Sequence, residues 1–90
     1  MAIRFSRSAS QHGVSHERSR YVVERCKCPL YPPDPGDEDL VVFLGPDDHG
    51  TDLEVIGVEL ADGNLLIIHA MKMRRRYLHD YAKVMECQGQ

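Results

Sequence analysis

The sequence predicts an α+β protein in which N-terminal helices precede a three- to four-stranded antiparallel sheet and a C-terminal helix. Apolar runs at residues 40–45, 53–60 and 65–70 are separated by turn residues, which is typical of a strand meander. Segments whose apolar residues recur at helical spacing lie before these strands and after them. Helices that are segregated from the strands in this way indicate α+β rather than α/β architecture.

The N-terminal part of the chain is expected to contain a short strand and two helices. Residues 3–5 suit an edge strand, and Ser6 or Ser8 can cap a short helix that ends by Gly13. A second helix is expected over about residues 16–25, because its apolar residues fall on one side of a helical turn.

A proline-rich segment at about residues 28–39 separates these helices from the strands. It has four prolines within seven residues, which excludes a helix and disfavours a central strand. Because the segment is short, we interpret it as an arm or loop within a single domain that covers residues 1–90.

The best-defined element is a hairpin that continues into a helix. Strands 53–60 and 65–70 flank Asp62-Gly63, a pair that accepts the positive φ angles of a tight turn. An amphipathic helix is then expected over residues 72–85. Its two opposite stripes are basic (Lys72, Arg75, Arg76, His79 and Lys83) and apolar (Tyr77, Leu78, Tyr81, Ala82 and Met85).

Composition and charge limit the class of protein. A chain of 90 residues, 42% hydrophobic and 28% charged, suits one globular domain with a modest core. No apolar run approaches the ~20 residues of a membrane span, and no apolar N-terminal signal precedes the domain. We therefore expect a cytoplasmic protein without membrane contacts. The three cysteines, an odd number in such a chain, indicate free thiols.

The charged residues are unevenly distributed along the chain. The net charge is −3, yet no Lys or Arg occurs between residues 28 and 71, where most of the acidic residues lie. A protein with basic ends can bind a polyanion through one surface while being acidic overall. The same pattern is also common on solvated surfaces without any ligand.

His69 lies where the last strand passes into the basic helix, and it is the central candidate residue. An unperturbed imidazole has a pKa near ~6.5, which suits proton transfer near neutral pH. Arginines such as Arg75 and Arg76 can hold a phosphodiester through paired N–H donors. The candidate catalytic residues are therefore His69, Arg75 and Arg76, and the candidate substrate contacts are Lys72, Tyr81, His79 and Lys83. The alternative is a structural His69 that is packed and hydrogen-bonded at the sheet margin.

No metal or cofactor is expected. His12, His16, Cys26 and Cys28 lack the paired Cys-x-x-Cys spacing of structural zinc sites. The acidic loop at residues 47–52 is typical of a solvated loop, and the chain has no glycine-rich phosphate-binding motif.

Three segments together resemble a known family. They are FSRSASQHGVS, LEVIGVELADGNLLIIHA and the arginine-rich segment that runs to Tyr81. In order and spacing they resemble the BrnT-like toxins, which are small toxins of bacterial type II toxin–antitoxin pairs in the RelE/ParE toxin superfamily. Residues 13–15 match the family's first motif, and residues 67–72 with Arg75, Arg76 and Tyr81 match the second in spacing.

This resemblance implies a RelE/ParE-like α+β fold, metal-independent cleavage of mRNA, free or on the ribosome, and a cognate antitoxin. Met71 stands where the family has an arginine, His69 stands where it has a small polar residue, and residues 28–39 have no counterpart. Two other functions stay open. One is a non-enzymatic module that binds protein or nucleic acid through the basic helix, and the other is a gyrase-inhibiting ParE-type toxin.

Overall fold

A computed structural model describes residues 2–32 and 39–89, so most of the proline-rich arm, residues 33–38, lies outside the described residues. The elements follow one another along the chain as β1 (Ile3–Phe5), η1 (Arg7–Ser10), α1 (His16–Arg25), β2 (Leu40–Pro46), β3 (Asp52–Glu59), β4 (Leu65–Lys72), η2 (Arg75–Tyr77) and α2 (Leu78–Gln88). The two η elements are 3-10 helices. The α+β class is confirmed. Within the described ranges, no helix is long and apolar enough to cross a membrane.

The four strands form one sheet in the order β1-β4-β3-β2. Strands β2, β3 and β4 pair in antiparallel fashion, as expected for strands joined by short turns. Strand β1 pairs with β4 in parallel, so the prediction of a wholly antiparallel sheet is wrong. A short turn forces antiparallel pairing, whereas β1 is joined to β4 through most of the chain and its direction is not constrained locally.

The N-terminal segments differ in part from the expected pair of helices. The first is only a four-residue 3-10 helix, η1, whereas α1 has the predicted bounds. Ser15 caps α1 by accepting the backbone N–H of Arg18 at 3.2 Å. Gly13, with φ of 79°, ends the preceding turn in a conformation that favours glycine.

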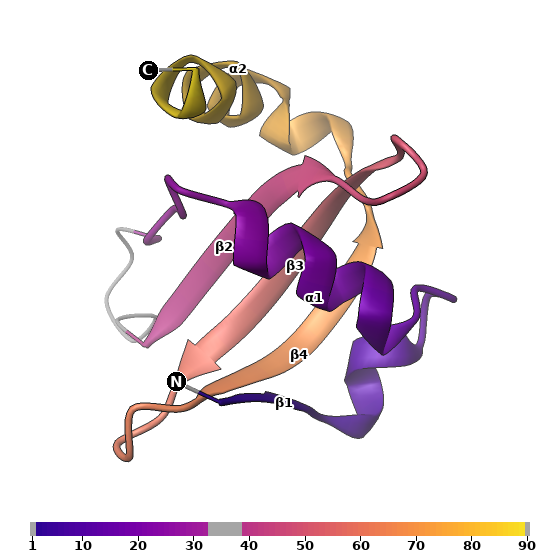
Figure 1. Cartoon of the computed structure of the whole chain (residues 1–90), viewed down its shortest axis with the longest axis vertical. Coiled ribbons are helices and arrows are strands. Elements are labelled where there is room, and N and C mark those ends of the chain that lie inside the picture. Colours follow the sequence, from indigo (N-terminus) through magenta and orange to yellow (C-terminus); the bar gives the residue numbers. More distant parts are fainter. Residues whose placement is uncertain (1, 33–38, 90) are drawn as a thin grey trace.

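Helix α1 lies across one face of the sheet (Figure 1), and residues of α2 pack on the other. Along β2, Val41 and Phe43 pack in the cluster that contains Val22 and Val23 of α1. Val42 and Leu44, which alternate with them, pack against Val84 of α2 on the opposite face. The continuous apolar run of β2 is explained by this burial on both sides.

The C-terminal helix begins later than the sequence predicts. Strand β4 extends to Lys72, which pairs with Leu53 of β3, and α2 begins only at Leu78. Lys72 therefore lies on a strand, Arg75 and Arg76 on a 3-10 turn, and the expected single basic stripe is wrong. Pairing with β3 keeps this segment extended, although its residues have helical spacing.

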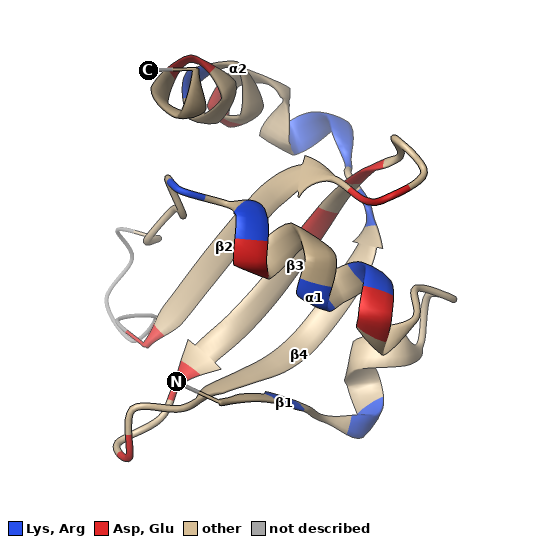
Figure 2. Cartoon of the chain, viewed as in Figure 1, with Lys and Arg blue, Asp and Glu red and all other residues tan. Residues whose placement is uncertain are grey.

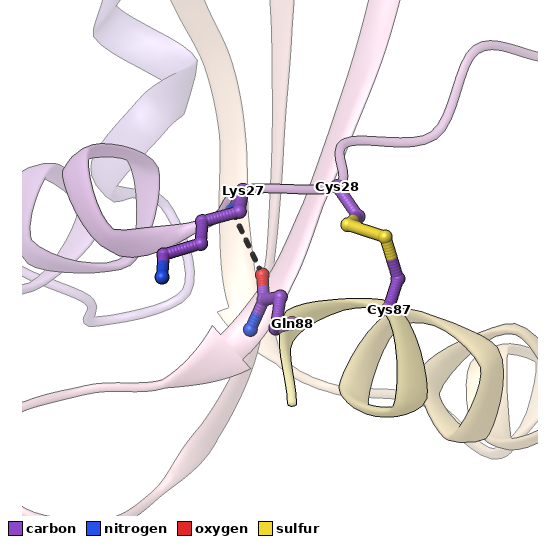
Figure 3. The surroundings of a disulfide bond; sticks show 4 residues. All are labelled: Lys27, Cys28, Cys87 and Gln88. Atoms are coloured by element: carbon purple, nitrogen blue, oxygen red, sulfur yellow. Dashed lines mark hydrogen bonds between the residues drawn. A yellow bond between two sulfur atoms is a disulfide. The ribbon is translucent and has the colours of Figure 1, made fainter. Parts of the chain in front are cut away.

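A disulfide joins the segment after α1 to α2, contrary to the expectation of three free thiols. Cys28, after α1, is bonded to Cys87 of α2, with 6.4 Å between their Cα atoms, and Cys26 is free (Figure 3). The backbone N–H of Lys27 also donates to Oε1 of Gln88 at 2.9 Å. An odd cysteine count requires only one unpaired thiol, and the packing of α2 on β2 brings the other two together.

Candidate functional site

The most unusual buried group in the sheet is the carboxylate of Glu54 on β3, whose side chain is 0% exposed. Arg74, just after β4, donates to it from the backbone N–H at 2.9 Å and from Nη2 at 2.7 Å. The Arg74 Nε also donates to it, at 2.9 Å. Nε2 of His69 lies 3.1 Å from Oε2 of the same carboxylate. A buried charge is tolerated only when it is paired in this way.

Glu54 is ionised in this environment. Burial raises the pKa of its carboxyl group, but hydrogen bonds and charge from Arg74, together with the bond from His69, hold the pKa below its ordinary value. An ionised carboxylate can only accept hydrogen bonds, so Nε2 of His69 must donate. The lone pair of a neutral His69 is therefore on Nδ1, which does not face Glu54.

A bulge in β4 determines where His69 points. His69 pairs with Ile56 and Ile67 pairs with Gly57, so Ile68 is an extra residue on β4. Bulges change the direction of a side chain and often lie next to functional sites. Because of this bulge, His69 lies on the same face of the sheet as Glu54.

A second imidazole lies next to the first. The ring of His12, in the turn between η1 and α1, is centred 5.3 Å from the ring of His69 and is inclined to it by 63°. His12 is exposed, whereas the side chain of His69 is 23% exposed. Ser8 Oγ donates to the carbonyl of Ile68 at 2.7 Å, which attaches η1 to β4 beside the two rings.

The other residues proposed from the sequence lie around this centre rather than in it. Figure 2 shows positive charge gathered where β4 passes into η2 and α2. The exposed members of the predicted set are Lys72, Arg75, Arg76, His79 and Lys83. The arginine that reaches Glu54 is Arg74, which sequence analysis passed over together with Glu54, and His12 was considered there only as a zinc ligand. One signal was present in the sequence: Glu54 is a charged residue between Leu53 and Val55 in an apolar strand.

The side chain of Tyr81 makes a hydrogen bond within the fold instead of lying free at the surface. Its hydroxyl donates to Oδ1 of Asp52, at the start of β3, and the side chain is half-buried. Burial and the neighbouring Asp52 carboxylate raise the pKa of Tyr81 to about 12. Tyr81 thereby attaches α2 to the end of β3 that carries Glu54.

The cluster is suited to proton transfer. It combines a carboxylate, two imidazoles and nearby exposed cations. Among residues 2–32 and 39–89, no three His, Cys, Asp or Glu side chains are arranged to hold a metal ion.

Comparison with models of known protein families, with curated proteins and with solved structures finds no match to this chain. Its function must therefore be inferred from the site.

Proposed function

We propose that this protein is a metal-independent ribonuclease that cleaves mRNA as the toxin of a bacterial toxin–antitoxin pair. The observation that most supports this proposal is the position of His69 between the buried carboxylate of Glu54 and the imidazole of His12. The resemblance of residues 13–15 and 67–72 to BrnT-like toxins supports the same activity and suggests action in the cytoplasm.

Cleavage of RNA without metal requires one group that takes a proton and another that gives one. In the proposed reaction, Nδ1 of His69 takes the proton of a ribose 2′-hydroxyl, whose oxygen attacks the adjacent phosphorus. The bond between phosphorus and the 5′-oxygen breaks, and protonated His12 gives its proton to that oxygen. The products are a 2′,3′-cyclic phosphate and a free 5′-hydroxyl, while His69 ends protonated and His12 neutral.

Glu54 acts in this scheme as a positioning residue. Its carboxylate holds the Nε2–H of His69, which selects the tautomer with a basic Nδ1. The same carboxylate stabilises the positive charge that develops on the ring when Nδ1 takes the proton, as an aspartate does for the histidine of a serine protease. Removing the carboxylate should therefore slow the reaction without removing any group that contacts RNA.

The phosphate is held by exposed cations, not by Arg74. Both Nε and Nη2 of Arg74 already donate to Glu54, so that guanidinium is largely occupied. Arg75, Arg76 and Lys72 are exposed beside it and can neutralise a phosphodiester. These cations stand in for the family arginine that Met71 replaces. An antitoxin would cover residues 72–83 with acidic or hydrophobic groups, so a complex that leaves this segment bare would contradict the proposal.

One observation favours a second function, a non-enzymatic binding module. The bonds between Glu54 and Arg74 also attach the chain after β4 to β3, and such an ion pair needs no reaction to explain it. In that case the basic segment would bind RNA or protein without cleaving it.

Cleavage of a short RNA by purified protein distinguishes the two functions. We expect cleavage in the presence of a chelator, no cleavage of the matching DNA, which lacks the 2′-hydroxyl, and products with cyclic phosphate ends. His69→Ala and His12→Ala should each lower the rate about 10²–10⁴-fold, and Glu54→Gln should lower it less. His49→Ala, an exposed histidine in the loop between β2 and β3, is the matched control. Binding without cleavage by the folded wild type would support the module.

Expression in a bacterial host tests the toxin itself. We expect growth arrest with loss of mRNA, and both effects should be relieved by His69→Ala. Arrest with intact mRNA and DNA-damage signalling would point instead to gyrase inhibition. Normal growth in cells that accumulate folded wild-type protein would exclude a toxin.

A further inference from the structure

A small hollow lies beside the candidate site, between the segment that follows α1 and the start of α2. It has a volume of about 260 Å³ and is lined by Tyr31, Tyr77, Arg76 and Asp80 over an apolar floor that includes Leu30 and Val42. Pockets for drug-sized ligands span roughly 300–1,000 Å³. The size of this hollow therefore suits one flat ring system rather than a larger molecule.

Two aromatic rings make the hollow suitable for a nucleobase. Tyr31 is 61% exposed, so its ring is accessible to a ligand. Tyr77 has the guanidinium of Arg76 over its ring at 5.1 Å. Exposed aromatic rings with neighbouring arginines are the usual platform on which proteins stack the bases of single-stranded RNA.

Asp80 supplies the polar group that can select the base. Its half-buried carboxylate lines the hollow, and within residues 2–32 and 39–89 no side chain is hydrogen-bonded to it or paired with it. A carboxylate offers two acceptor oxygens side by side. Guanine presents two adjacent N–H donors, N1–H and N2–H, on its Watson–Crick edge. In adenine, cytosine and uracil, the donor on that edge is flanked by an acceptor that a carboxylate would repel.

The hollow is connected to the proposed catalytic residues through one ring. The guanidinium of Arg74, which is bound to Glu54, lies 6.0 Å from the centre of the Tyr77 ring, and Arg76 lies over the same ring. Tyr77 thus links the hollow to Arg74, which is bonded to the same Glu54 carboxylate as His69. We propose that the hollow is a base-binding subsite that selects guanine in RNA through Asp80, an inference that rests on the proposed ribonuclease activity.

Binding of mononucleotides to the full-length oxidised protein tests the subsite without any cleavage. The probes are the 3′-monophosphates of guanosine, adenosine, cytidine and uridine, and the readout is the NMR shift of backbone amides during titration. We expect guanosine 3′-monophosphate to bind most tightly and to shift Tyr31, Tyr77 and Asp80. Asp80→Asn should weaken guanosine binding about ten-fold or more and should not weaken the binding of the other three nucleotides, whose acceptor atoms the carboxylate repels. Tyr31→Ala should weaken all four about ten-fold.

Two controls keep the result specific. Asp48→Asn removes an exposed carboxylate in the loop between β2 and β3 and should leave guanosine binding unchanged. Tyr31→Phe keeps the ring and should retain stacking, so its loss of binding would overturn the role assigned to the ring. Equal binding of all four nucleotides, or an Asp80→Asn variant with unchanged preference, would overturn guanine selection. Guanosine preference without RNA cleavage would support the subsite but overturn the ribonuclease. Cleavage without base preference would support the ribonuclease but overturn the subsite.

Discussion

The guanidinium of Arg74 and the carboxylate of Glu54 form a two-point contact across the sheet, with Nη2 bonded to Oε2 at 2.7 Å and Nε bonded to Oε1 at 2.9 Å. The carboxylate is fully buried, whereas the Arg74 side chain is 42% exposed. This contact keeps Glu54 ionised beside His69 and holds the start of η2 against β3. One ion pair thus serves both the fold and the proposed site.

Removing Arg74 should destabilise the protein more than removing the neighbouring Arg75. Arg74→Ala leaves a buried carboxylate without its main partner, so we expect a loss of about 3 kcal/mol in the free energy of unfolding, the low end of the range for buried pairs because water can reach Arg74. Arg75→Ala, at an exposed position, is the control and should change it by less than about 0.5 kcal/mol. Urea denaturation of both variants measures the difference. Equal effects would mean that the ion pair contributes no more than a surface contact.

Protonation of two buried carboxylates should destabilise the protein at low pH. Burial opposes the ionisation of both carboxyl groups. Hydrogen bonds from Arg74 nevertheless hold the pKa of Glu54 below its ordinary value. Hydrogen bonds from Thr51, Arg18 and His49 do the same for the pKa of Asp47. The unfolded state then takes up protons first, so this stability is complete above about pH 4–5 and is lost as the pH falls through the lowered values.

Circular dichroism during acid titration checks this pH dependence. Glu54→Gln and Asp47→Asn should each flatten the fall in the free energy of unfolding below about pH 4. Asp48→Asn, at the exposed neighbouring position, should leave the fall as it is in the wild type. If the free energy of unfolding falls as steeply with pH in Glu54→Gln and Asp47→Asn as in the wild type, other carboxylates govern acid unfolding.

The disulfide should stabilise α2 and the sheet against unfolding. Cys28 and Cys87 are 59 residues apart in sequence, and closing a loop of that length stabilises a chain by about 4 kcal/mol. We expect Cys28→Ser, or a reducing agent, to lower the melting temperature, whereas Cys26→Ser changes the free thiol and should have a small effect. Because reducing compartments keep thiols free, the cytoplasmic action proposed above requires the reduced protein to stay folded. Thermal unfolding with and without reductant measures both effects.

Tyr81 should be the last tyrosine to ionise. Burial and Asp52 raise its pKa to about 12, so a spectrophotometric titration should show one tyrosine that titrates near that pH. A raised pKa means that this contribution to stability is complete below pH ~10 and is lost as the pH rises through the folded value. Tyr81→Phe should remove this step and also separate α2 from Asp52. A variant that keeps the late step would assign it to another tyrosine.

Much of the fold could be predicted because it is encoded by local patterns. The hairpin turn needs a residue with positive φ, which Gly63 supplies at 87°, and strands β3 and β4 flank it as predicted. Helix α1 follows from Ser15 and from the spacing of its apolar residues. The proposed site could be predicted only at His69, a titratable residue that precedes a basic segment, and its expected position at a strand end was wrong because β4 continues to Lys72.

The amino-acid sequence by itself determined the α+β class, the hairpin and α1. These depend on spacings of two to four residues and on turn chemistry, which act within one segment. Only the tertiary structure decided that β1 lies parallel to β4, that Cys28 bonds Cys87, and that Arg74 and His12 reach the site. These relationships join segments far apart in the chain. They are fixed by sheet register, by one bulge and by the packing of α2, which no local pattern contains.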